Sequence, residues 1–271
     1  MDFDDPSLNS PFPILKWIFS QDEGKQLLLF AAHGLLIFGL CIVVLWFART
    51  RLRAPTDYMP VAPSFVAITT LFSLLFAFHA GEVWNSKSRA KQDFILMDLY
   101  VQRLSQLVSK AEVDLPEARR ELVVFLKSVV DEEWIKYHNT RPSENAVMAL
   151  SNLQAIAAKL AKTMPDPNAQ LLQGVLYDIA RARAEKFSLS RSGPNYLAWI
   201  IILALGLLAH LSITIVSLDK PRAAVSILTL FSIATTLAFW AIAIDELPYR
   251  SISKYGFENW RRLIATAEAM N

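Results

Sequence analysis

Residues 58–81 read YMPVAPSFVAITTLFSLLFAFHAG and contain no Asp, Glu, Lys or Arg. About 20 helical residues are enough to cross the roughly 30 Å hydrocarbon core of a bilayer. This stretch of 24 residues is therefore long enough to cross a membrane. Three further uncharged stretches lie at residues 26–48, 192–218 and 223–244, and all of them are rich in Leu, Ile, Val, Phe and Ala.

The four stretches predict an all-α membrane protein with four transmembrane helices, near 27–48, 61–84, 195–217 and 221–244. The remaining parts are then an N-terminal segment over 1–26, a long polar segment over 85–194 and a C-terminal segment over 245–271. The spans fall into two pairs, 27–84 and 195–244, on either side of the long segment. We expect that segment to be a helical bundle inserted between the second and third spans.

The composition excludes several classes of protein. Hydrophobic residues make up 54% of the 271 residues, and the mean hydropathy of +0.32 is high for a soluble enzyme. The net charge of +2 gives no reason to expect a nucleic-acid partner. The single cysteine, Cys41, rules out a disulfide framework and a cysteine-based zinc site.

The distribution of Lys and Arg predicts the orientation. With four spans, both termini and the long segment lie on the same side of the membrane. Close to the membrane that side carries eleven basic residues, and the other side carries five, which are Arg49, Arg51, Arg53, Lys220 and Arg222. The positive-inside rule then places both termini and the 85–194 bundle in the cytoplasm, with the protein in the cell inner membrane.

The long segment has helical periodicity. Phe94, Met97, Val101, Leu104 and Val108 repeat at the spacing of one helix face, and this helix continues the second span. Pro116 opens a second helix with Leu122, Val123, Leu126 and Val130 on one stripe, Ser143 is a candidate N-cap of a third, and a fourth runs from about 168 to 187.

Residues 11–19, PFPILKWIF, allow two interpretations. They form a short interfacial segment with Trp17 and Phe19 at headgroup level and Lys16 near phosphate, or a leader that packs on the protein. At the span ends, Trp46, Trp84, Trp199 and Trp240 are expected to form an aromatic belt.

The motifs of enzymes are absent. The sequence has no phosphate-binding glycine loop, no GxSxG, no HExxH and no CxxC, so we expect neither catalysis nor a cofactor or bound metal. The adjacent Glu132 and Glu133 point to different faces of a helix and cannot act as a carboxylate pair. His79 and His210 lie within spans, and each is either hydrogen-bonded to a backbone carbonyl or functional.

The second span carries a stripe of aromatic residues. Phe65, Thr69, Phe72 and Phe76 follow at i, i+4, i+7 and i+11, so they share one helix face. Such a stripe most often packs on neighbouring helices or lipid. If several copies surround an axis, it becomes a stack of apolar rings that water leaves readily, which is a gate.

The layout resembles the bestrophin-like family of bacterial membrane proteins. The residues that carry the resemblance are Pro63-Ser64-Phe65-Val66, Glu82-Val83-Trp84-Asn85, Glu132-Glu133-Trp134 and the segment from Asp245 to Arg250. The better-studied bestrophins are homopentameric, anion-selective channels with four membrane helices and both termini inside. The resemblance implies a homo-oligomer in a lipid bilayer, a pentamer, that conducts small anions.

The resemblance also implies a neck on the second span. It falls first on Val61 and Phe65 and then on Thr69, where a large apolar residue is usual in bestrophins. Together with the stripe, the predicted pore-lining residues are Val61, Phe65, Thr69, Phe72, Phe76 and His79. Glu82, Lys87, Arg89 and Lys91 are expected at the cytoplasmic mouth, and no acidic cluster suggests calcium binding.

Two other functions stay open. A non-conducting scaffold or sensor would use the cytoplasmic bundle to bind a protein partner. A proton-driven stator also has four spans and a large loop after the second. That class places prolines within its last two spans, whereas the one proline in 195–217 and 221–244 is Pro221, at the first position of its span. Asp245 and Glu246 follow the fourth span, where we expect a cation such as Arg250 to compensate them.

Overall fold

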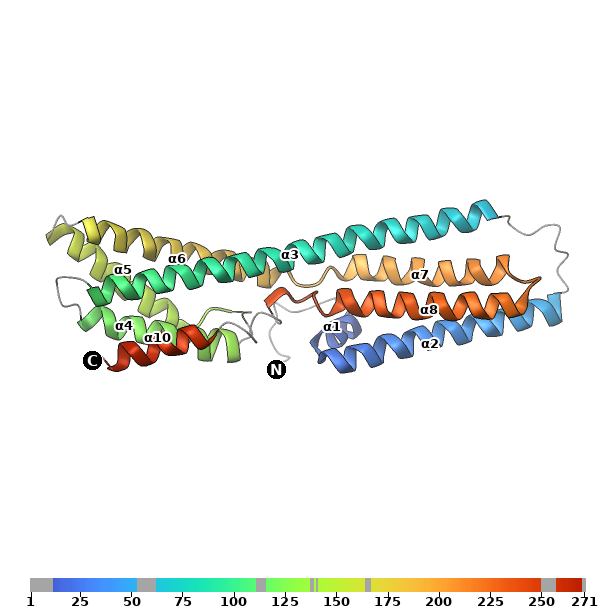
Figure 1. Ribbon diagram of the computed structural model, residues 1–271, viewed down its shortest axis with the longest axis horizontal. Helices are drawn as coiled ribbons and strands as arrows, with labels where there is room; N and C mark the ends of the chain where they lie inside the picture. Colours follow the sequence, from blue (N-terminus) through green and yellow to red (C-terminus); the bar gives the residue numbers. More distant parts are fainter. Residues whose placement is uncertain are drawn as a thin grey trace. The chain divides into compact units, whose positions relative to one another are not determined.

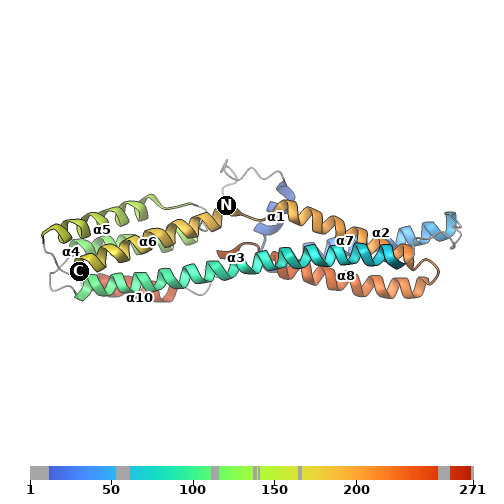
Figure 2. The same cartoon turned by 90° about the horizontal axis from the view of Figure 1, so that it is seen from above.

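The protein is described here from a computed structural model that covers residues 12–52, 62–110, 116–136, 139, 141–163, 167–249 and 257–269. Every secondary-structure element in these ranges is helical. The chain divides into two compact units, which are described separately (Figures 1 and 2). The first comprises Met1–Trp84 and Pro194–Glu246, and the second comprises Asn85–Gly193 and Leu247–Asn271.

All four predicted spans are confirmed as apolar helices. They are α2 (Glu23–Phe47), the first part of α3 (Ala62–Lys110), α7 (Tyr196–Val216) and α8 (Pro221–Ala243). A short π-helical segment, η2 (Ala48–Leu52), extends α2. The helix α3 runs without a break from the second apolar stretch into the charged segment that follows it, as the sequence predicts.

In the first unit, α2, α7 and α8 pack against one another, and the short helix α1 (Pro13–Ser20) lies beside the start of α2 (Figure 1). The core contains large aromatic side chains, which include Phe30, Phe72, Trp199 and Phe239. Trp199 is fully buried, so its predicted place in a lipid-facing belt is wrong. Trp46 and Trp84 are exposed, as a belt requires.

Two glycines on α2 give a matched test of how closely it packs on α8. A Cβ atom added at Gly34 would collide with the Oγ1 atom of Thr236, whereas one added at Gly39 would meet nothing within 4 Å. We expect Gly34→Ala to destabilise the protein by about 1–3 kcal/mol through overpacking. Gly39→Ala should be neutral or slightly stabilising, because alanine favours helix. Thermal melting in detergent measures both, and equal melting temperatures for the two variants would contradict the close α2–α8 crossing.

The second unit contains the rest of α3, together with α4 (Pro116–Lys127), the π-helical η4 (Ser128–Lys136), α5 (Glu144–Thr163), α6 (Pro167–Ser192) and α10 (Phe257–Ala269). Its core mixes aliphatic and aromatic side chains, with Leu104, Leu122, Phe125, Leu153 and Trp260 almost completely buried. Both stripes predicted from the sequence, on α3 and on α4, contribute to this core.

Local sequence signals set the helix starts. Proline occupies the first position of α4, α6 and α8, where its missing N–H group leaves no bond unmade. The predicted N-cap at Ser143 is confirmed, because its Oγ atom accepts a hydrogen bond from the Ala146 N–H at 3.2 Å. At α7, the Asn195 Oδ1 atom accepts from the Ala198 N–H at 3.2 Å.

Candidate functional site

The aromatic stripe of α3 faces its own subunit. Phe72 is buried, and its ring lies 6.3 Å from that of Phe231 and 6.2 Å from that of Phe239, both on α8. A Cβ atom added at Gly206 of α7 would come within 3.4 Å of the Phe72 ring. Phe76 also contacts Phe239, with ring centroids 5.8 Å apart. These contacts fill the space between α3 and the α7–α8 pair.

The other predicted lining residues lie on the same inward face. Phe65 and Thr69 are half-buried, and the Thr69 hydroxyl donates to the carbonyl oxygen of Phe65 at 2.9 Å. His79 is 4% exposed. Val61 lies outside the described residues. The structure thus brings the predicted stripe together, and other residues of the same chain bury Phe72 and His79.

The opposite face of α3 is exposed through the apolar stretch. Thr70, Leu74 and Phe78 follow one another at four-residue spacing, and the exposed fractions of Leu74 and Phe78 are 49% and 66%. Between and beside them lie small exposed residues, Ala67, Ser73, Ala77 and Gly81. We call Thr70, Leu74 and Phe78 the outer stripe. The apolar stretch of α3 also exposes Val66 and Leu71, and α2 and α8 expose large aliphatic residues such as Leu35 and Leu230, which suit lipid.

A buried acid–base pair closes one end of the first unit. The Nε2 atom of His79 lies 3.5 Å from the Oε2 atom of Glu246, and both side chains are almost completely buried. The two side chains are in polar contact, but this contact is not a hydrogen bond. The other carboxylate oxygen of Glu246 accepts from the Asn195 N–H at 3.2 Å, close to the start of α7, where the helix dipole favours negative charge.

This pair answers the expectation that Glu246 needs a compensating group. The structure supplies His79 from α3, whereas Arg250 lies outside the described residues. The helix of the fourth span ends at Ala243, before Glu246. Because His79 contacts Glu246, the simpler interpretation of His79 as a histidine hydrogen-bonded to a backbone carbonyl is wrong.

His210 does match that simpler interpretation. Its Nδ1 atom lies 2.7 Å from the carbonyl oxygen of Gly206, and because a carbonyl only accepts, Nδ1 is the donor. Its Nε2 atom lies 3.1 Å from the Ser232 hydroxyl on α8. The imidazole is 2% exposed and thus forms a satisfied polar link between α7 and α8.

The predicted mouth residues are at the surface. Glu82 is exposed in the first unit, and Arg89 and Lys91 are exposed in the second. Lys87 is half-exposed. Their side chains are available to set the local potential along α3 as the charged part of the helix begins.

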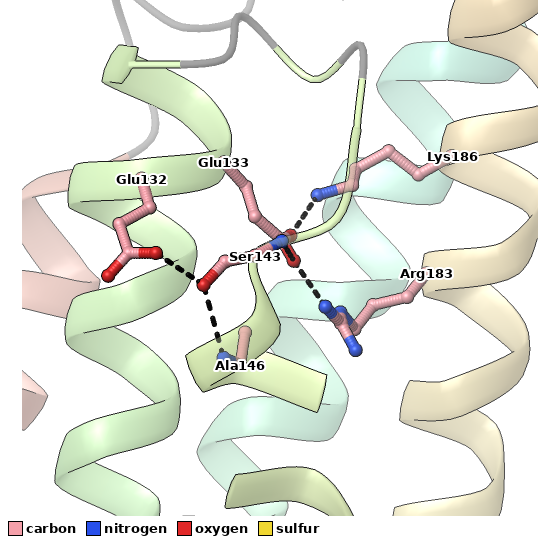
Figure 3. Close-up of polar contacts among 6 residues, drawn as sticks. All are labelled: Glu132, Glu133, Ser143, Ala146, Arg183 and Lys186. Atoms are coloured by element: carbon pink, nitrogen blue, oxygen red, sulfur yellow. Dashed lines mark hydrogen bonds and ion pairs between the residues drawn. The ribbon is translucent and has the colours of Figure 1, made fainter. Parts of the chain in front are cut away.

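The second unit contains a buried ionic cluster that the sequence did not reveal (Figure 3). Glu133, which is fully buried, forms ion pairs with Arg183 and, at 2.7 Å, with Lys186 of α6. It also accepts a hydrogen bond from the Ser143 N–H at 3.2 Å. Glu132 points elsewhere and accepts from the Ser143 hydroxyl at 2.6 Å, so the two glutamates do face different ways.

The backbone after η4 makes this cluster possible. Asn139 has a positive φ of 61°, a conformation that asparagine tolerates better than most residues. Its N–H donates to the carbonyl oxygen of Glu133 at 2.7 Å. Ser143 caps α5 and contacts both glutamates.

Burial changes the titration of the groups around the cluster. Burial, only partly offset by Glu133, lowers the pKa of Lys186 to about 8. The pKa of Asp93 is raised by burial and by nearby Glu185, and the pKa of Tyr249 is raised by burial and by Asp93, whose Oδ2 atom accepts from the Tyr249 hydroxyl at 3.4 Å. These residues line a cavity of about 10 Å³, which is the size of one water molecule and too small for an organic ligand.

Lys186 gives the stability of the protein a pH dependence of defined sign. A lysine in an unfolded chain keeps its proton up to about pH 10.4. Between pH 8 and 10 the unfolded chain therefore binds more protons at this position than the folded protein, so this group makes the protein more stable as the pH rises. We expect wild type to gain on the order of 2 kcal/mol relative to Lys186→Met over this range.

Melting curves recorded at intervals between pH 8 and 10 measure this difference. Lys162→Met, at an exposed position of α5, is the matched surface substitution. Parallel pH profiles for wild type and Lys186→Met would contradict the assignment.

A metal site is not apparent in the part of the chain that the structure describes. Within those ranges no three His, Cys, Asp or Glu side chains come close enough together to hold an ion. The polar side chains that do converge are the His79–Glu246 pair and the Glu133 cluster, and each is an ion-pair arrangement.

Comparison with known proteins identifies the family. The profile of the Bestrophin-like domain matches residues 35–251, which is well over half of the chain. The chain belongs to the bestrophin-like family. No curated protein sequence matches it.

Solved structures of the family share its fold. A variant of a bacterial bestrophin homologue from Klebsiella pneumoniae superposes with a TM-score of 0.66 at 12% identity, over 90% of this chain and 99% of that one. A second structure of that homologue gives a TM-score of 0.65 at 13% identity, over 88% and 98% of the two chains. At this identity the likeness establishes the fold of this bestrophin-like protein, and its function is argued from its own residues.

Proposed function

We propose that this bestrophin-like protein is the subunit of an oligomeric, anion-selective channel in the cell inner membrane. Family membership and the four apolar helices support a multi-pass membrane protein of a channel family. The excess of Lys and Arg near the membrane supports a topology in which both termini and the second unit are cytoplasmic.

The observation that carries the proposal is the outer stripe of α3. Thr70, Leu74 and Phe78 project away from the subunit, while the predicted stripe through Phe72 packs on α7 and α8. We therefore transfer the proposed lining from the inward face to the outer stripe. Copies of Leu74 and Phe78 around an axis form consecutive apolar rings about one turn, or roughly 6 Å, apart, and such a constriction gates by dewetting.

Aromatic rings give this neck a preference for anions. The edge of a phenyl ring is the positive part of its quadrupole, so Phe78 edges stabilise a partly dehydrated anion better than aliphatic groups do. Thr70 adds a hydroxyl that can donate to the ion. At the proposed mouth, exposed Arg89 and Lys91 offset the negative charge of exposed Glu82.

The exposed face of α3 also supports the proposal of an oligomer. Small residues such as Ala67, Ala77 and Gly81 allow helices to approach closely in a membrane, and exposed Ser73 and Thr70 are better placed against protein or water than against lipid. Thr69 and His79, which also entered the sequence argument for assembly, are satisfied or buried within one subunit. The resemblance to bestrophins makes a pentamer the expected number.

Two measurements test this proposal. Native mass spectrometry of the protein in mild detergent is expected to show a homo-oligomer, most readily a pentamer, and a monomer alone would contradict it. Chloride efflux from liposomes that contain the purified protein tests conduction. A scaffold that binds a partner through the second unit gives an oligomer of any size but no efflux.

A further inference from the structure

The short helix α1 is held firmly against the first unit by one side. Leu15 and Phe19 are buried, and the Phe19 ring lies 5.1 Å from that of Trp199 and 6.3 Å from that of Tyr196 on α7. The Gln26 side chain of α2 donates to the carbonyl oxygen of Phe19 at 3.2 Å, and this bond is buried. Phe19 therefore cannot face lipid headgroups, as one interpretation of the sequence required.

The other side of α1 is apolar and exposed. Ile14 is 72% exposed and Trp17 is 47% exposed. The backbone at this end needs no further partner, because the carbonyl oxygen of Trp17 accepts from the Ser20 hydroxyl at 2.7 Å and from the Gln21 amide at 3.2 Å. The exposed side of α1 therefore presents apolar surface.

Charged residues fix the level of α1 relative to the spans. The helix is followed within two residues by α2, whose N-cap residue Asp22 forms an exposed ion pair with Lys25 in the first turn. Charged groups of this kind stay at the water side of a membrane. The indole N–H of half-buried Trp240 donates to the carbonyl oxygen of Glu23 at 3.0 Å, which places a second tryptophan at the same level.

We propose that α1 is an interfacial anchor whose exposed side, Ile14 and Trp17, inserts into the boundary between lipid headgroups and acyl chains. A tryptophan has an apolar body and a polar N–H, and this boundary offers partners for both. The locked inner side, the exposed apolar outer side and the adjacent charges are the features of a helix that lies in the plane of the interface. The partner is the bilayer itself, and the anchor fixes the depth at which α2 enters it.

Depth-resolved quenching tests the proposal on the full-length protein in phosphatidylcholine liposomes. A fluorescent label is attached at Trp17→Cys in a Cys41→Ala background, since Cys41 is the native cysteine. Asp22→Cys is the aqueous control, and Leu35→Cys and Leu230→Cys, which are highly exposed within α2 and α8, are the acyl-chain controls. Lipids with a nitroxide near the headgroup or near the chain end report depth, and aqueous iodide reports contact with water.

The label at position 17 is expected to lose most emission to the headgroup-side nitroxide and less to the chain-end nitroxide. Its iodide quenching should be well below that at position 22. Iodide quenching equal to that at position 22 would overturn the proposal, as would a depth equal to that of the acyl-chain controls. Protection from all quenchers would show that a protein surface covers α1, and this result would overturn it too. None of these outcomes depends on whether the protein conducts ions.

Discussion

Shortening Leu74 and Phe78 together to alanine is expected to raise chloride flux through the assembled protein. In the proposed channel each change widens one apolar ring in every subunit at once, so water enters the constriction more easily. Lowering the barrier by about 1.4 kcal/mol increases the rate tenfold, and we expect an increase of about this size or more. Chloride efflux from liposomes measures it, with native mass spectrometry as the check that assembly is retained.

The matched control is Phe72→Ala with Phe76→Ala on the inward face of α3. These side chains pack on Phe231 and Phe239, so their loss leaves cavities and lowers stability by about 3–5 kcal/mol for the more buried Phe72. Flux should not rise. If this double variant raised flux and the Leu74→Ala, Phe78→Ala variant did not, the pore lining would be the face of α3 first predicted from the sequence.

Neutralising Glu133 is expected to be the most damaging single change in the second unit. Glu133→Gln leaves the buried cations Arg183 and Lys186 without their shared anion. Removing one partner of a buried ion pair typically costs about 3–5 kcal/mol. Thermal melting and hydrogen exchange of η4 and α6 should both report this loss.

Two variants separate this charge effect from a general loss of packing. Glu132→Gln, which changes a carboxylate held by surface hydrogen bonds to Ser143 and Asn145, should cost no more than about 1 kcal/mol. Adding Lys186→Met to Glu133→Gln removes one of the two unpaired cations and should recover part of the loss. Equal effects of Glu132→Gln and Glu133→Gln would contradict the buried cluster.

The sequence was most informative where the physics is local. Uncharged length located the four spans to within a few residues, because a charge is costly in a bilayer wherever the helix is placed. Ser143 was recognisable as a cap, and the stripes on α3 and α4 were recognisable as core, because both signals depend on residues only a few positions apart.

The direction in which a helix face points could not be predicted from the sequence. A helical stripe shows that Phe65 and Phe72 share a face, but it does not show whether that face turns to the subunit, to lipid or to an axis. The contact of Phe72 with Phe239 turns this face toward α8, and Phe239 lies far away in the sequence. Trp199 was placed at an interface by its position near a span end, although α1 covers it with Phe19.

The two ionic arrangements were missed for a similar reason. Glu133 pairs with Arg183 and Lys186 some fifty residues later, and His79 meets Glu246 from the opposite end of the chain. One signal for the first was available, since Arg183 and Lys186 are spaced to share a helix face. For the second, the buried position of His79 within a span was the signal.

The most direct test of the account is the reversal potential of the wild-type protein in a planar bilayer under a tenfold potassium chloride gradient. An anion channel gives a measurable current that reverses near the chloride equilibrium potential, about 59 mV in magnitude. A reversal potential of the opposite sign, at the potassium equilibrium potential, would contradict anion selectivity. An oligomer that carries no current at any voltage, in wild type and in the Leu74→Ala, Phe78→Ala double variant alike, would contradict the channel itself.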